Sequence, residues 1–442
     1  MNADLLIKNC SILTSDFEIN HGQNIVIKDH KIVAIEKELT QIYVAKETLD
    51  GKGKLVMPGL IDAHTHTNQQ LLRGRISDEY PMIWTRIMVP FESNLQEEDV
   101  AISAELSCLE MLKAGTTGFI DAGGSYMHKV AEAVETSGLR GVLTCSTMDT
   151  GAAIPESMKT TMEHNIQRNK DLFDAYHEKA DGRIHVWYSL RSLITCTPEL
   201  IQKVYEIAIA SGTGMQTHMN EYTNEISYCL ENFQMRPYEY LESLGVLDKN
   251  FLGAHSILLS ENEVDLIQKY DSKVVHCPIS NAGKGVTKSP SLMQKGVSIG
   301  LGTDGSAHSG LSLFDQMKVF KSLMRAFWGV PIFDPVVMPS KNILEMATIG
   351  GAKAMLQDKQ FGSLEVGKKA DMILINTDQP HIGPTHQLTN TLIESANSND
   401  VADVIVNGRI LMKNREVLTL DEERIKYESK KAMDDLIVRA KI

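Results

Sequence analysis

The chain of 442 residues is poor in several features that mark whole classes of protein. Its six cysteines include no C-x-x-C pair and are too sparse for a disulfide framework or a zinc knuckle. Lysine and arginine number 44 against 57 acidic residues, for a formal net charge of −13, so the positive surface that nucleic acid needs is not expected. No apolar run approaches the roughly 18 to 20 residues of a membrane span, and the N-terminus lacks the pattern of a signal peptide. We therefore expect a cytoplasmic protein without nucleic-acid or membrane partners.

What remains is an ordinary globular composition, with 43% hydrophobic and 23% charged residues. Both ends of the chain are rich in short β-branched runs separated by turn residues, which is typical of strands. At the far end, Asn407-Gly408 between two apolar runs predicts a hairpin, and a helix is expected over about 420–440. The sequence therefore predicts one small β domain, a β-sandwich built from residues 1–57 and 359–442. Within the first of these segments the strand-like runs are 5–7, 11–13, 24–27 and 31–35.

The middle of the chain alternates between apolar runs and segments with helical periodicity, such as 100–114, 127–137 and 198–211. Eight such α/β units predict a distorted (β/α)8 TIM barrel over residues 58–358. A doubly wound sheet is the alternative, but no G-x-G-x-x-G follows the first strand. The eight expected strands are 60–63, 117–120, 141–144, 184–188, 214–217, 251–254, 273–275 and 297–301.

Histidines and acids gather at the C-terminal ends of these expected strands, where barrel active sites form. His64 and His66 are two residues apart, which puts both side chains on one face of a strand. With His218 and Asp304 they make a nitrogen and oxygen donor set suited to Zn²⁺ or Fe²⁺. Such an ion lowers the pKa of bound water towards ~7 and supplies hydroxide at neutral pH.

Two further residues complete a hydrolytic site in this interpretation. Glu221, three residues after His218, is placed to carry the proton, and His255 could orient the hydroxide or polarise the attacked centre. Each residue alone also has a simpler interpretation, because an isolated H-x-H is a weak signal and Asp304 could be a turn residue. His276 could bind substrate or merely pack at the end of its strand. Surface or loop positions are expected for three other histidines: His308, His185 and His381.

Several motifs resemble the amidohydrolase superfamily, in particular its branch of nucleobase and heterocycle aminohydrolases. That branch includes S-adenosylhomocysteine and methylthioadenosine deaminases and is related to chlorohydrolases. The segments that carry the resemblance cover nearly the whole chain: PGLIDAHTH at 58–66, QTHMNE at 216–221, GAH at 253–255, HCPISN at 276–281, LGTDG at 301–305 and GSLEVGKKAD at 362–371.

The resemblance implies a barrel with one catalytic divalent metal, usually zinc. His64, His66, His218 and Asp304 match the family's ligands, Glu221 its proton shuttle and His255 its hydroxide-orienting histidine. Relatives with two metals carry a carboxylated lysine at the end of strand four, where this chain has Arg191, so one metal is expected. Zinc deaminases of the cytidine type need P-C-x-x-C, which this chain lacks.

The expected reaction is hydrolytic deamination of an aminated nitrogen heterocycle, a carbon–nitrogen bond cleavage of the cyclic-amidine type. Trp84 and Glu92 resemble the segment that adenosine-type deaminases use near the ribose, which suits S-adenosylhomocysteine or methylthioadenosine. Arg191 could instead bond a ring carbonyl of an oxo-purine or pterin, or form a structural ion pair. Hydrolysis of a cyclic amide or a C–Cl bond is the alternative, and a catalytically silent binding homologue is a minor one. Relatives are often dimers or larger, so a homo-oligomer is compatible with the sequence.

Overall fold

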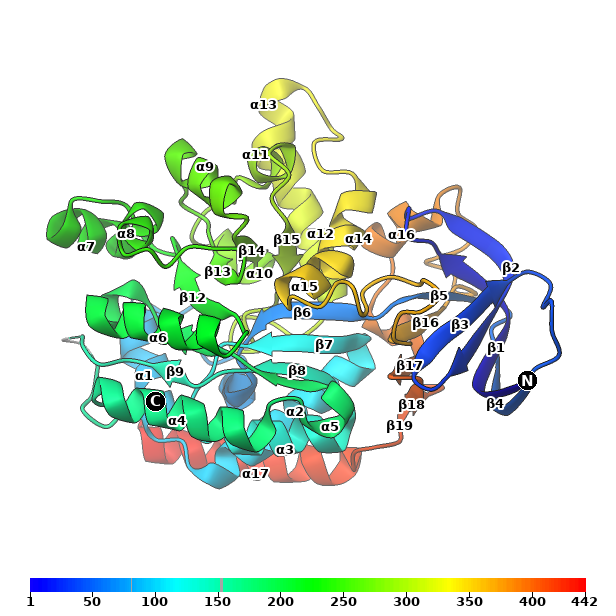
Figure 1. Cartoon of the computed structure of the whole chain (residues 1–442), viewed down its shortest axis with the longest axis horizontal. Coiled ribbons are helices and arrows are strands. Elements are labelled where there is room, and N and C mark those ends of the chain that lie inside the picture. The colour runs from blue at the N-terminus through cyan, green and yellow to red at the C-terminus, as the bar shows by residue number, and fades with distance from the viewer. Residues whose placement is uncertain (81, 152–153) are drawn as a thin grey trace.

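The computed structural model describes residues 1–80, 82–151 and 154–442. It is an α/β structure in which parallel strands and their helices form the larger part, and a separate sheet lies at one end (Figure 1). This sheet contains the first and last strands of the chain, so the two termini contribute to the same layer, as predicted.

The terminal sheet has nine strands in the order β19-β18-β17-β16-β5-β1-β2-β3, with β4 pairing to β1. The runs expected at 5–7 and 11–13 are one strand rather than two, because a register shift between Ile7 and Cys10 absorbs the polar residues between them. The predicted hairpin is confirmed, since β17 and β18 pair antiparallel across Asn407 and Gly408, whose φ values are 49° and 71°. The strands are β1 (Asn2–Leu13), β2 (Ile19–Lys28), β3 (Lys31–Glu36), β4 (Val44–Asp50), β5 (Lys54–Pro58), β16 (Met372–Asn376), β17 (Val401–Val406), β18 (Arg409–Lys413) and β19 (Glu416–Val417).

All eight runs expected in the middle of the chain contain strands, and they pair in parallel. They form two sheets, in the orders β10-β8-β7-β6 and β15-β14-β13-β12-β11-β9. The third run contains one strand of the first sheet and is followed closely by a short strand of the second, and the fourth run is broken into two strands, one in each sheet. The strands are β6 (Leu60–Thr65), β7 (Thr116–Asp121), β8 (Arg140–Leu143), β9 (Ser146–Thr147), β10 (Ile184–Val186), β11 (Tyr188–Leu190), β12 (Met215–Met219), β13 (Phe251–His255), β14 (Lys273–His276) and β15 (Ile299–Leu301).

The two parallel sheets approach each other where β15 ends beside β6. The His64 carbonyl oxygen accepts hydrogen bonds from the backbone N–H groups of Thr303 and Asp304, at 3.2 and 3.0 Å. Gly302 makes this approach feasible, because a Cβ there would lie 2.7 Å from the His64 carbonyl oxygen. The strand that carries two histidines is therefore held directly against the segment that carries Asp304.

Helices surround the parallel strands, and the last of them, α17, packs against α2 (Figure 1). The three helical segments predicted from periodicity are confirmed as α2, α3 and α6, and the expected C-terminal helix is α17. The longer helices are α2 (Glu97–Ala114), α3 (Met127–Ser137), α4 (Met162–Tyr176), α6 (Pro198–Ala210), α7 (Thr223–Phe233), α8 (Pro237–Ser243), α9 (Glu261–Tyr270), α12 (Leu313–Met324), α14 (Ser340–Ala347), α16 (Leu388–Glu394) and α17 (Glu422–Ala440). The shorter ones include α1 (Val89–Ser93), α5 (Lys179–Gly182), α10 (Pro278–Ala282), α11 (Ser289–Gln294), α13 (Val330–Ile332) and α15 (Ile349–Ala354).

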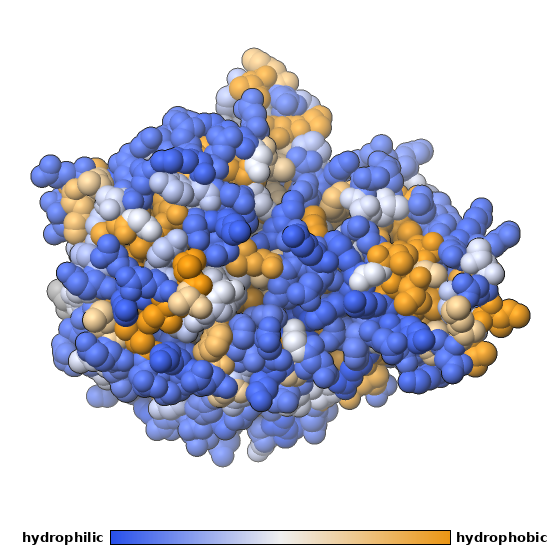
Figure 2. All heavy atoms as spheres, in the orientation of Figure 1, coloured by the Kyte–Doolittle hydropathy of each residue, from blue (hydrophilic) through white to orange (hydrophobic). Residues whose placement is uncertain are grey.

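The visible surface is mostly hydrophilic (Figure 2). Its exceptions include the projecting tip at α13, where Val330, Ile332 and Phe333 are exposed, the last to 95%. Among the described residues, no helix has the length and apolar character needed to cross a membrane. All six cysteines are buried and have free thiols.

Candidate metal-dependent active site

Three strand ends deliver the side chains predicted to bind metal. His64 and His66 project from β6 and its end, as the period-two spacing requires, and both are nearly inaccessible to solvent. His218 comes from β12, and Asp304 lies just beyond β15. Asp304 has a φ of 62°, which turns the chain sharply after the strand and which aspartate tolerates better than most residues. The structure therefore brings together all four predicted ligands.

The spacing of the donor atoms fits one small cation. His66 Nε2 lies 3.2 Å from His218 Nε2, and Asp304 Oδ1 lies 3.4 Å from His64 Nε2 and 3.5 Å from His66 Nε2. Ligands of a tetrahedral zinc ion, about 2.0 to 2.1 Å from the metal, would be separated by roughly 3.3 Å. The donor atoms of His64, His218, His255 and Asp304 also lie within 4.8 Å of one another, a group that has His255 in place of His66. From Asp304 Oδ1 the distance is 3.5 Å to His66 Nε2 and 3.8 Å to His255 Nε2.

The protonation states of these imidazoles also suit a metal. Burial, together with the charge of nearby Arg191, holds the pKa of His66 well below its usual value, and burial does the same for His218. The rings are therefore neutral at pH 7, the form that binds metal. Several buried ring nitrogens have no hydrogen-bond partner among the described residues, and this is costly unless a ligand occupies the site. They are both ring nitrogens of His64, Nδ1 of His66, Nδ1 of His218 and Nε2 of His255.

Glu221 and His255 face each other at the edge of this cluster. Glu221 Oε2 lies 3.8 Å from His255 Nε2, and His255 Nδ1 lies 3.0 Å from Asn281 Oδ1. With the amide oxygen as acceptor, Nδ1 carries the proton and Nε2 presents a lone pair to the site. Burial would raise the pKa of Glu221, but neighbouring positive charge, including that of the Lys284 ammonium, acts in the opposite direction and holds it at about 2. The carboxylate is therefore ionised and able to accept a proton.

The sequence analysis missed a second group of polar side chains behind the two carboxylates. Lys284 Nζ lies 2.5 Å from Glu221 Oε1, and Ser280 donates a hydrogen bond to Asp304 Oδ2. His308, expected at the surface or in a loop, lies beside the same oxygen, with its Nε2 at 3.3 Å and only 18% of its side chain exposed. His308 does lie in the loop after β15, as expected, and the new finding is that its side chain is turned towards Asp304. In the sequence, Lys284 stands between Gly283 and Gly285 after the seventh expected strand, and this pattern could have marked it as a candidate site residue.

Three of the four residues predicted to contact substrate lie together. Arg191 donates a hydrogen bond to Glu92 Oε1 at 3.2 Å, and its guanidinium lies 6.0 Å from the centre of the Trp84 ring. Gln69, which the sequence analysis did not single out, donates to the same Glu92 oxygen at 2.8 Å. The ion pair is buried, with 7% of the Arg191 and 8% of the Glu92 side chain exposed. The ion pair that the sequence allowed for Arg191 is therefore present in the structure.

His276, by contrast, is fully buried below the cluster. Its Nδ1 donates a hydrogen bond to the His255 backbone carbonyl at 2.8 Å, and its ring lies 6.4 Å from that of Phe320. Burial lowers its pKa to about 4, so it is neutral. These contacts favour the packing role that the sequence also allowed.

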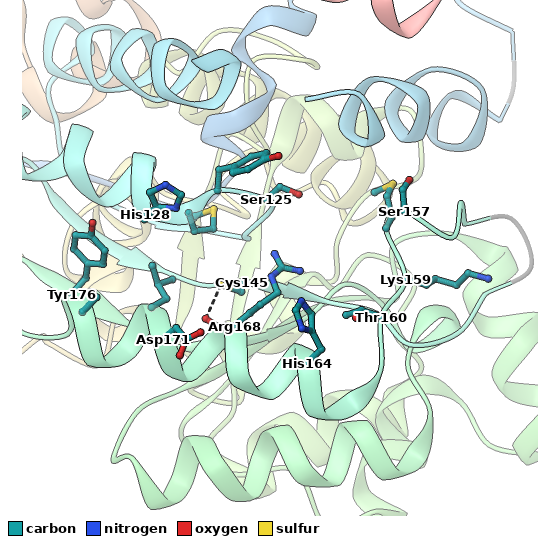
Figure 3. A pocket seen from close by; sticks show the side chains of 15 residues that line it. Ser125, His128, Cys145, Ser157, Lys159, Thr160, His164, Arg168, Asp171 and Tyr176 are labelled. Carbon is teal, nitrogen blue, oxygen red and sulfur yellow. Dashed lines mark hydrogen bonds between the residues drawn. The ribbon is translucent and has the colours of Figure 1, made fainter. Parts of the chain in front are cut away.

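A separate groove lies between α3 and α4, with a cavity volume of 520 Å³ (Figure 3). Arg168 and His164 of α4 point into it, opposite Ser125 and His128. None of the predicted site residues lines this groove. The groove is therefore separate from the predicted site at the strand ends.

Comparison with known proteins agrees with this geometry. A 5-methylthioadenosine/S-adenosylhomocysteine deaminase of Thermoanaerobacter pseudethanolicus is 35% identical over 99% of this chain and all of its own length. A 5'-deoxyadenosine deaminase of Methanobrevibacter smithii is 36% identical over 98% of both chains. The crystal structure of a zinc-bound adenosine deaminase from Xanthomonas campestris has the same fold, with a TM-score of 0.93 and 24% identity over 99% of both chains.

The family model of the amidohydrolase family matches residues 55–411, which include every strand of the two parallel sheets. The predicted resemblance and the predicted class of enzyme, a metal-dependent hydrolase that deaminates heterocycles, are thereby confirmed. The chain belongs to the amidohydrolase family.

Proposed function

We propose that this protein deaminates the adenine ring of 5'-modified adenosines, with 5-methylthioadenosine, S-adenosylhomocysteine and 5'-deoxyadenosine as the candidate substrates. The observation that carries the proposal is an ionised carboxylate, Glu221, beside a histidine and aspartate cluster spaced for one cation. The names of the two relatives supply the substrate class. Glu92, with Trp84 beside it, supports a ribose site, because its Oε2 is not used by Arg191 or Gln69.

In this proposal His64, His66, His218 and Asp304 hold one zinc ion. When bound, zinc lowers the pKa of a coordinated water towards about 7 and so makes a nucleophile available at neutral pH. The His255 Nε2 lone pair accepts a hydrogen bond from the attacking water and orients it. Glu221 takes the water's proton and delivers it to the ring nitrogen next to the amino-bearing carbon. Water and the amidine thus give a ring carbonyl and ammonia.

The two parallel sheets fit this proposal as parts of one distorted (β/α)8 barrel. Their strands follow the chain order of a barrel, and the bonds from Thr303 and Asp304 to His64 join the last strand to the first. We extend the proposal to the domains, with a barrel over 58–358 and a β-sandwich from 1–57 and 359–442. A reducing, cytoplasmic setting is consistent with six free thiols.

The test is ammonia release by zinc-loaded protein across a panel of adenosine, the three 5'-modified adenosines, guanine, 8-oxoguanine, pterins and aminotriazines. We expect turnover of the 5'-modified adenosines, with kcat/KM at least tenfold above that of free guanine. If protein with one zinc per chain releases no ammonia from any compound of the panel, deamination is contradicted and hydrolysis of a cyclic amide or a C–Cl bond is favoured.

The role of Glu221 is tested by Glu221→Gln, which keeps the size and removes the base. We expect kcat to fall by at least about 10³-fold, within the range for loss of a general acid–base group and its positioning. Zinc content should stay near one per chain, because Glu221 is not among the four proposed ligands. Retained turnover would remove Glu221 from the mechanism.

A second candidate function is deamination of an oxo-purine or pterin. Arg191 is the observation that favours it, because its guanidinium is buried between Glu92 and the metal-site histidines and has further N–H donors for a ring carbonyl. Turnover confined to the oxo-substituted rings of the panel would support this candidate over the first.

A further inference from the structure

A buried lysine in the loop after β14 reaches both carboxylates of the candidate site. Its ammonium nitrogen, Lys284 Nζ, lies 2.5 Å from Glu221 Oε1 and 3.9 Å from Asp304 Oδ2. Only 9% of the side chain is exposed, and the ammonium lies 5.0 Å from the ring centre of Tyr222. An ammonium removed from water to this extent is costly unless anions compensate it. Its place is therefore set by the two carboxylates.

The backbone of the same loop fixes where the lysine can reach. Helix α10 ends at Gly283, and the Asn281 carbonyl oxygen accepts hydrogen bonds from the N–H groups of Lys284 and Gly285, at 2.7 and 3.0 Å. The Asn281 side chain also bonds His255. One turn thus orients the histidine and the lysine that lie on either side of Glu221.

We propose that Lys284 is a positioning residue that sets the orientation of Glu221 for proton transfer. This inference rests on the proposed function. The terminal torsion of a glutamate is broad, so a free carboxylate would rotate between many orientations. Lys284 engages Oε1, and the other oxygen, Oε2, is then the one that faces His255 Nε2 at 3.8 Å. The oxygen that accepts the proton is held towards the reacting atoms.

The same ammonium acts on the second carboxylate through a serine. Lys284 donates a hydrogen bond to Ser280 Oγ at 2.9 Å, and Ser280 donates to Asp304 Oδ2. Asp304 Oδ1 is then left to face His64 and His66. In each carboxylate one oxygen therefore faces Lys284, directly in Glu221 and mainly through Ser280 in Asp304, whose Oδ2 also faces His308. The other oxygen faces the imidazoles of the metal site, which is the arrangement expected if Lys284 orients the pair.

The experiment compares Lys284→Met with Lys288→Met in the zinc-loaded protein. Methionine keeps most of the stem and removes the charge. Lys288 is a control in the same loop, and among the described residues its ion-pair partner is Glu261, a side chain 68% exposed. On the substrate that the wild type turns over, we expect kcat of Lys284→Met to fall on the order of 100-fold, as for loss of acid–base positioning. KM should change less than threefold, and Lys288→Met should match the wild type. A rise in KM at unchanged kcat would overturn the proposal.

A second variant separates positioning from a general loss of structure. In Lys284→Ala, millimolar ethylamine should restore at least about a tenth of the lost rate in a saturable manner, because the cavity admits an ammonium beside Glu221. Absence of rescue in a folded variant that retains zinc would overturn the proposal.

The third measurement does not depend on turnover. A crystal structure of zinc-loaded Lys284→Met should show the Glu221 carboxylate rotated away from His255, whereas an unmoved carboxylate would overturn the proposal. A wild type that is silent on the whole panel contradicts the proposed function instead, and this structural comparison still tests the role of Lys284.

Discussion

Arg191 illustrates how much a single side chain determines at this site. Its guanidinium neutralises Glu92 in a buried pair. Its charge also lowers the pKa of His66 and His218, and for His66 it is the largest cause after burial. Removing one partner of a buried pair leaves an uncompensated charge, which costs about 3 to 5 kcal/mol. We expect Arg191→Met to lower the free energy of unfolding by about 3 kcal/mol, measured by urea denaturation followed by circular dichroism.

The matched control for this prediction is the double variant Arg191→Met/Glu92→Gln. It removes the Glu92 negative charge that Arg191→Met leaves without a counter-ion, and the new amide oxygen can still accept the hydrogen bond from Gln69. Most of the lost stability should therefore return. If Arg191→Met has the same free energy of unfolding as the wild type but loses turnover of oxo-substituted rings, the ion pair is not the main role of Arg191. That result would support a contact between Arg191 and a ring carbonyl.

At the residue scale, the sequence was sufficient for side chains that follow strand ends. His64, His66, His218 and Asp304 could be found because parallel strands end at one edge, so strand periodicity alone places them together. Lys284, Gln69 and Ser280 could not, because they lie in loops or short helices whose path depends on packing. His308 lies in a loop, as expected, but its contact with Asp304 could not be predicted, because the loop contains no periodic signal.

At the scale of elements, the site depends on how closely the segment after β15 approaches β6. A methyl group at Gly302 would lie 2.7 Å from the His64 carbonyl oxygen and 2.9 Å from its amide nitrogen, closer than real contacts allow. We expect Gly302→Ala to push the two segments apart, with a loss of about 1 to 3 kcal/mol in stability. Zinc affinity, measured by competition with a chromogenic chelator, should weaken on the order of tenfold because ligand orientation is disturbed.

Gly283 provides the comparison for that variant. A Cβ there meets no atom within 4 Å, and the residue has an ordinary helical φ of −80°, so Gly283→Ala should leave zinc affinity unchanged. Equal zinc affinity in both variants would show that the approach of β15 to β6 does not control the ligands.

The strands also show how far elements can be predicted from sequence pattern. Apolar runs located all eight strands, because burial on both faces of a parallel strand gives a recognisable run. They did not show that the pairing breaks at the end of the third run and within the fourth. The breaks fall near Thr144 and Trp187, where the chain passes from neighbours in one sheet to neighbours in the other. These neighbours are distant in the sequence, so the local composition gives no sign of the change.

At the scale of the whole molecule, a buried ion pair joins the parallel strands to the terminal sheet. Arg140 of β8 donates to both carboxylate oxygens of Asp371, just before β16, and to the side-chain oxygen of Asn407. Its guanidinium also lies 4.8 Å from the ring centre of Phe361. Both charged side chains are at most 2% exposed. The hairpin at Asn407 is thus tied to the inner strands, and the terminal sheet is held in place by a partner contributed from the middle of the chain.

This arrangement predicts that the two parts of the molecule unfold together and that the ion pair contributes strongly to their coupling. Asp371→Asn leaves the Arg140 charge buried without its counter-ion, so we expect the free energy of unfolding to fall by about 3 to 5 kcal/mol. The measurement is urea denaturation followed by tryptophan fluorescence, which reports on Trp84, Trp187 and Trp328, all in the larger part. Glu47→Gln breaks an exposed pair with Lys413 in the terminal sheet and should cost less than about 1 kcal/mol. A cost for Asp371→Asn as small as that of the control would mean that apolar packing, and not this ion pair, holds the terminal sheet to the strands that carry the site.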